Sequence, residues 1–116
     1  MTMYSRIWRK LRDKRYRDAF VNSQLKRSIP FQIAALRKKR GWSQEQLADA
    51  ASVTQGVISR AENPHYGNLT LNTILRIANG CDVGVILEFV SFSKLIKVYK
   101  GRSEDLAPDT FEKEIR

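Results

Sequence analysis

The sequence predicts a mainly α-helical protein organised around a helix-turn-helix pair, with a helical extension before the pair and a β-strand after it. Two short stretches, residues 43–51 and 54–62, carry apolar residues at helical spacing and leave room only for a turn between them. Other helical stretches flank the pair, and a run of β-branched and aromatic residues follows over residues 82–92. We therefore divide the chain into a basic helical extension (1–28), a helix-turn-helix domain (29–82), a dimerising strand and short helix (83–100) and a polar tail (101–116).

Each helix of the pair has a start signal. Ser43 is the expected N-cap of the first helix, and Gln46 three residues later completes a capping box. Thr54 is the expected N-cap of the second helix. Two helices this close must cross steeply, which favours a small residue such as Ala48 at the contact. This arrangement presents the second helix to the DNA major groove.

The flanking helices are read in the same way. The spacing of apolar residues in the extension predicts one helix from Met3 to about Lys14 and another over residues 15–27, with a bend or break near residues 13–15. Ser28 is expected to cap the first helix of the domain, with Pro30 in its first turn and Gly41 as its left-handed end. Thr70 is expected to cap a helix that ends near residues 79–80.

The predicted strand needs a partner. Residues 82–92 are largely apolar on both faces, which predicts burial on both sides. A lone strand leaves its backbone groups unpaired, and the weak alternative strand over residues 95–99 reads better as a short helix. We therefore expect pairing with the same strand of a second subunit, with Val85, Leu87 and Phe89 in the dimer contact.

The net charge of +9 and pI near 10.1 point to a polyanionic partner. Residues 1–40 hold 13 Lys and Arg against two acidic residues, whereas residues 41–80 and 81–116 each have a net charge of −1. The excess positive charge therefore lies in the N-terminal third. Two interpretations stay open for the extension: a solvated helix that covers one side of the core, and direct contact with DNA. A membrane surface is less favoured because the apolar residues are few.

Several function classes are excluded. With one cysteine, Cys81, and one histidine, His65, the chain has no internal disulfide, no catalytic triad and no cysteine- or histidine-rich metal site. We expect no enzyme activity, no cofactor and no metal. The N-terminus lacks the apolar core of a signal peptide, and the longest near-apolar run, residues 83–90, is too short to span a bilayer. We therefore expect a cytoplasmic protein.

Residues 33 to about 85 resemble the Cro/phage-repressor (XRE-type) helix-turn-helix family. The resemblance implies an ion pair between Arg37 and Glu62, whose inward-leaning positions also require pairing. It also implies sequence-specific binding of double-stranded DNA by a homodimer at an inverted repeat, and a transcriptional regulator, most simply a repressor. The residues that carry the resemblance are Leu36, Arg37, Gly41, Trp42, Ser43, Gln44, Leu47, Ala48, Val53, Thr54, Ile58, Ser59, Arg60 and Glu62. The predicted DNA-contacting residues are Gln44, Thr54, Gln55, Gly56, Ser59, Arg60, Asn63 and Lys39.

The chain departs from this family in three places, one of which is the predicted C-terminal strand, since many members have a fifth helix instead. The loop after Glu62 is longer, with its glycine delayed to Gly67, and about thirty residues precede the first helix of the domain. Small proteins of this family also serve as antitoxins, which bind a toxin protein and their own operator. An antitoxin is therefore the alternative function, with the extension or the tail as the part that binds the toxin.

Overall fold

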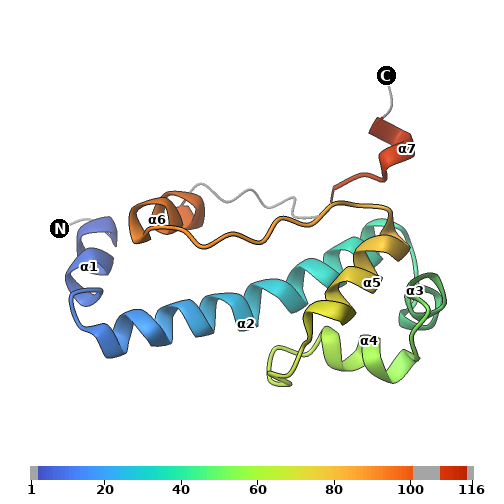
Figure 1. Cartoon of the computed structure of the whole chain (residues 1–116), viewed down its shortest axis with the longest axis horizontal. Helices are drawn as coiled ribbons and strands as arrows, with labels where there is room; N and C mark the ends of the chain where they lie inside the picture. Colours follow the sequence, from blue (N-terminus) through green and yellow to red (C-terminus); the bar gives the residue numbers. More distant parts are fainter. Residues whose placement is uncertain (1–2, 101–107, 115–116) are drawn as a thin grey trace.

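The computed structural model describes residues 3–100 and 108–114, and every regular element in these ranges is an α-helix (Figure 1). None of the described helices is long and apolar enough to cross a membrane. The helices are α1 Met3–Lys10, α2 Lys14–Lys39, α3 Gln44–Ala51, α4 Gln55–Ala61, α5 Leu71–Cys81, α6 Phe92–Lys100 and α7 Phe111–Glu114.

The long helix α2 joins the extension to the domain without a break (Figure 1). Asp13 caps its start, so the predicted break near residues 13–15 is confirmed. The predicted cap at Ser28 is wrong. The Ser28 side chain is buried and its hydroxyl accepts a hydrogen bond from Gln32 Nε2 at 3.0 Å, so it does not cap a new helix. Pro30 lies buried in the helix interior and not in a first turn as predicted, and it has no N–H to donate to the Lys26 carbonyl.

The helix starts within the domain follow their predicted caps. The Ser43 hydroxyl accepts from the Gln46 N–H at 3.1 Å, and the Gln46 side chain accepts from the Ser43 N–H at 2.8 Å, which completes the capping box. Thr54 and Thr70 cap α4 and α5 by accepting from the N–H group three residues on. These caps satisfy backbone donors that the first turn of a helix otherwise leaves without a partner.

Three helices end in the left-handed conformation. Gly41 after α2, Ser52 after α3 and Asp82 after α5 have φ values of 68°, 57° and 58°. In each case the next residue donates to a carbonyl five residues back, as Trp42 does to Arg37 at 3.1 Å. The turn of the helix-turn-helix is therefore closed by Ser52, where glycine would adopt this backbone conformation at lower cost.

The core lies between α2, α3, α4 and α5. The helices approach closely at Gly80 of α5, where a Cβ atom would lie 2.7 Å from the carbonyl carbon and oxygen of Ala50. Small residues therefore set the crossing of α3 and α5, as Ala48 does at the buried face of α3. The buried cluster consists of Ile33, Leu36, Leu47, Ala48, Ala51, Ile58, Ala61, Ile77 and Cys81.

A second, smaller apolar cluster lies at the other end of the molecule, where α6 returns to α1 and the first half of α2 (Figure 1). Leu11 is 3% exposed and Ile96 of α6 is fully buried. The rings of Phe20 and Tyr99 meet edge to face at 5.7 Å. The short helix predicted over residues 95–99 is confirmed as part of α6, and it anchors the C-terminal part of the chain on the extension.

The segment between α5 and α6 does not form the predicted strand. It is extended, but the structure contains no strand among the described residues, and the backbone of residues 84–90 makes no hydrogen bond to another described residue. The side chains of residues 84–90 are exposed rather than buried, with Ile86 at 87%, Leu87 at 74% and Phe89 at 105%. The physical reason is that one chain supplies no partner strand, so the apolar pattern that predicted burial has nothing to be buried against.

Part of the predicted polar tail, residues 101–107 and 115–116, lies outside the described residues. The rest attaches to the domain through its backbone and one ion pair. The Phe111 N–H donates to the Asp82 carbonyl at 3.1 Å, and Asp109 pairs with Lys39 at 3.5 Å. The Phe111 ring is 62% exposed, so it does not anchor this part of the tail by burial.

Candidate nucleic-acid interface

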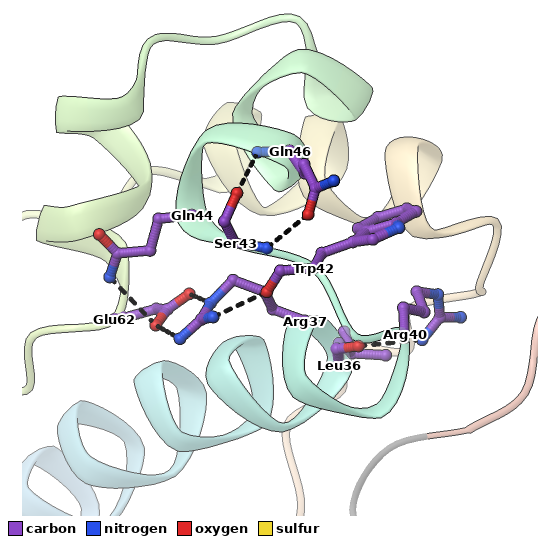
Figure 2. Close-up of polar contacts among 8 residues, drawn as sticks. All are labelled: Leu36, Arg37, Arg40, Trp42, Ser43, Gln44, Gln46 and Glu62. Carbon is purple, nitrogen blue, oxygen red and sulfur yellow. Dashed lines mark hydrogen bonds and ion pairs between the residues drawn. The ribbon is translucent and has the colours of Figure 1, made fainter.

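An ion pair fixes the end of α4 to α2 (Figure 2). Arg37 donates through Nε to Glu62 Oε2 at 2.7 Å and through Nη2 to Oε1 at 3.0 Å, and its Nη1 donates to the Trp42 carbonyl at 2.9 Å. The side chains are only 16% and 8% exposed. The hydrogen bond to Glu62 raises the pKa of Arg37 above its ordinary value, so the guanidinium stays charged. This planar, two-bond pairing sets the angle of α4 against the rest of the domain.

Gln44 adds a third connection to the same carboxylate. Its Nε2 donates to Glu62 Oε1 at 3.3 Å, from the first residue of α3 (Figure 2). The amide oxygen is an acceptor, and the second N–H of the same amide is still available to donate. One glutamate thus ties together α2, α3 and α4, so the two helices of the pair are held as one rigid unit.

The face of α4 opposite the core is polar and open. Ile58 and Ala61 point into the core, whereas Gln55, Ser59 and Arg60 are exposed. Gln55 and Ser59 are four residues apart, as are Gly56 and Arg60, so each pair lies on one side of the helix. Thr54 caps the start of α4 and is also exposed. The predicted contact residues of α4 therefore form one surface.

The loop after α4 continues this surface. The Asn63 side-chain oxygen accepts from the His65 N–H at 2.9 Å, which leaves the NH₂ group of Asn63 able to donate. The Tyr66 N–H donates to the Asn63 carbonyl at 3.1 Å and closes a turn. This turn returns the chain to α4, where the Arg60 guanidinium lies 5.8 Å from the centre of the Tyr66 ring.

Two groups of predicted site residues lie away from this surface. Lys39, predicted to contact DNA, forms its ion pair with Asp109 of the tail at 3.5 Å. Val85, Leu87 and Phe89, predicted to form the dimer contact, lie on the extended segment between α5 and α6.

Sequence reasoning missed two residues beside the surface. Lys26 of α2 lines the same cleft as Arg60 and Asn63, although it precedes the expected domain. Tyr66 lies under Arg60 across the turn. An unbroken α2 would have placed Lys26 here, and an aromatic residue in the loop after the second helix was the available signal for Tyr66.

The residues that the structure describes do not gather the side chains that a metal site requires. No group of three histidine, cysteine, aspartate or glutamate residues in residues 3–100 and 108–114 is placed to hold a metal ion. Cys81 is buried in the core, and burial raises the pKa of its thiol despite the nearby charge of Arg40.

The comparisons with known proteins agree with this geometry. Residues 33–86 match the family model described as Helix-turn-helix, which covers the last seven residues of α2 and all of α3, α4 and α5. Comparison with curated proteins and with solved structures gave no match. The matched range contains the capped helix pair and the Arg37–Glu62 ion pair. This match supports the resemblance of residues 33–86 to the Cro/phage-repressor (XRE-type) helix-turn-helix family, whose members are DNA-binding transcription regulators.

Proposed function

We propose that this protein binds a specific double-stranded DNA sequence as a homodimer and represses transcription. The observation that carries the proposal is the exposed polar face of α4, held at a fixed angle by the Arg37–Glu62 pair. Gln55 suits the N6 and N7 edge of adenine, and Arg60 suits guanine O6 and N7 or a phosphate. Gln44, Thr54, Ser59 and Asn63 supply further donors for the backbone and bases along the same surface.

The proposed dimer contact uses the exposed segment between α5 and α6. In an extended chain alternate residues share a face, so Val85, Leu87 and Phe89 form one apolar face. All three are exposed, Phe89 completely. A second copy would cover these side chains and pair with the free backbone groups of residues 84–90, which removes apolar area from water.

Selection of bound sequences from random DNA duplexes tests the proposal. A homodimer should enrich an inverted repeat whose half-sites are about 34 Å, one helical turn, apart. Enrichment of a single half-site would leave DNA binding in place and reject the dimer. Arg60→Ala should weaken binding to the selected site by about 1–3 kcal/mol if Arg60 contacts a base. A reporter gene behind the selected site should be transcribed less when the protein is present.

Sedimentation of the free protein tests the dimer contact separately. Phe89→Asp places a charge on the proposed apolar face and should give a monomer. Val98→Asp is the matched control, because Val98 of α6 is also exposed, at 54%, but lies outside the segment. If Phe89→Asp leaves a dimer intact, the contact lies elsewhere.

The antitoxin alternative is favoured by one feature of the extension and the start of the domain. A groove along α2 is lined by the aromatic residues Tyr16, Phe20 and Phe31 of this helix and by Tyr99 of α6. Aromatic grooves of this kind suit an apolar protein segment. A short toxin-like reading frame beside the gene, whose product co-purifies with this protein and is released by Phe31→Asp, would favour the antitoxin function.

A further inference from the structure

The side chain of Arg60 has a defined place in the structure although it is exposed. Its guanidinium carbon lies 5.8 Å from the centre of the Tyr66 ring, within the range of a cation–π contact. Tyr66 itself is held by the turn that its N–H makes with the Asn63 carbonyl. The chain then leaves the turn at Gly67, with φ at +77°.

Gly56 leaves space beside this guanidinium. A Cβ atom at position 56 would lie 3.3 Å from Arg60 Nη1 and 3.8 Å from Thr54 Oγ1. The Arg60 side chain therefore lies back along α4, across the residue four positions earlier, with its terminal nitrogen close to position 56. A contact of 3.3 Å is tighter than most Cβ atoms accept, so alanine here would push the guanidinium away.

We propose that Tyr66 is a positioning residue for Arg60, and that it and Gly56 hold the guanidinium ready for a guanine edge or a phosphate. This inference rests on the proposed DNA binding and deepens it. A long arginine side chain loses rotamer freedom when it binds, and a side chain already ordered in the free protein loses less. The glycine in α4, which weakens a helix, is then explained by the arginine that lies over it.

Measured affinities for the selected site test the role of Tyr66. Tyr66→Leu should weaken binding about two- to five-fold, the value of one exposed cation–π contact, and Tyr66→Phe should keep most of the affinity. In an Arg60→Ala background Tyr66→Leu should change nothing. Equal losses in both backgrounds would mean that Tyr66 touches DNA itself and would overturn the proposal.

The same cycle tests Gly56. Gly56→Ala should strengthen α4, because alanine is the better helix former, so any loss of binding is not a loss of folding. The loss should be present with Arg60 and absent in Arg60→Ala. A loss that persists without Arg60 would mean that the added methyl group meets DNA, and would overturn the assignment of Gly56 to Arg60.

A measurement on the free protein separates this inference from the proposed function. The aromatic ring shifts the proton resonances of Arg60 in an NMR spectrum, so Tyr66→Leu should move these resonances toward random-coil values and Tyr66→Phe should not. Unchanged resonances in Tyr66→Leu would overturn the positioning role even if the wild type binds DNA. Absence of DNA binding by the wild type, with shifted resonances, would reject the proposed function alone.

Discussion

Of the single changes to charged residues that we propose, the removal of Arg37 should destabilise the domain the most. In Arg37→Met the Glu62 carboxylate, 8% exposed, would keep only the Gln44 amide at 3.3 Å as a donor. Breaking a buried pair by removing one partner costs about 3–5 kcal/mol, because the remaining charge stays out of water. Arg37 is 16% exposed, so water can reach part of the vacated space. We therefore expect about 3 kcal/mol, the lower end of that range.

Urea unfolding of the variants measures this loss as a shift in midpoint at constant slope. The double variant Arg37→Met/Glu62→Leu removes both charges and should recover stability to within about 1 kcal/mol of the wild type. Lys14→Met is the control, because the Lys14–Asp18 pair, at 3.0 Å, is 74% and 60% exposed. Its loss should be about 0.3–0.5 kcal/mol.

The result that would refute this reasoning is a loss below about 1 kcal/mol for Arg37→Met, the range of surface ion pairs. The pH of the assay does not weaken the arginine side of the pair. The pKa of Arg37 is raised in the folded protein. The stability that this shift contributes is therefore fully present at every pH below the ordinary pKa of arginine, and it is lost only at higher, strongly alkaline pH.

Three further experiments test the crossing of α3 and α5, the turn at Ser52 and the burial of Cys81. Gly80→Ala should lower the free energy of unfolding in urea by about 1–3 kcal/mol, because the added Cβ meets the Ala50 backbone at 2.7 Å. Gly84→Ala, where the Cβ would lie in open space, is the control, and equal effects of the two changes would contradict the close crossing of α3 and α5. Ser52→Gly should raise the stability by about 1 kcal/mol by relieving the left-handed backbone at φ 57°, and a lower urea midpoint would contradict this. Cys81 should not react with iodoacetamide at neutral pH until urea unfolds the protein, because the thiol is buried and its pKa is raised. If mass spectrometry shows alkylation of the native protein, the placement of Cys81 in the core is refuted.

The parts of the fold that depend on neighbouring residues could be predicted from the sequence. The capping box at Ser43, the caps at Thr54 and Thr70 and the left-handed Gly41 each follow from chemistry within a few positions. The error at Ser28 has the same origin. A serine before a proline has the local pattern of a helix start, but the tertiary structure buries Ser28 and continues α2 through it.

The parts that depend on distant residues could not be predicted in this way. The burial of Ile96 requires α6 to return to the extension, and no local pattern specifies that return. Lys26 reaches the cleft beside Arg60 only because α2 is unbroken. The apolar pattern of residues 84–90 predicted a buried strand, but burial needs a packing partner, and the structure leaves these side chains exposed; pairing with a second subunit stays a prediction.

The basic extension is therefore a folding unit as well as a source of charge, and this decides how its role can be tested. Deleting residues 1–27 would remove Leu11 and Phe20 and expose Ile96, so any change in DNA binding would mix lost charge with lost structure.

Lys26 offers a cleaner test, because it is exposed and lies beside Arg60 and Asn63. If Lys26 neutralises one phosphate, Lys26→Gln should reduce the slope of the logarithm of the DNA-binding constant against the logarithm of salt concentration by about 0.9. Lys10→Gln is the control, because Lys10 lies on α1 at the far end of α2, and this change should leave the slope unaltered. Equal reductions would mean that DNA follows the whole length of α2, and no reduction in either would leave the extension with packing or partner binding as its role.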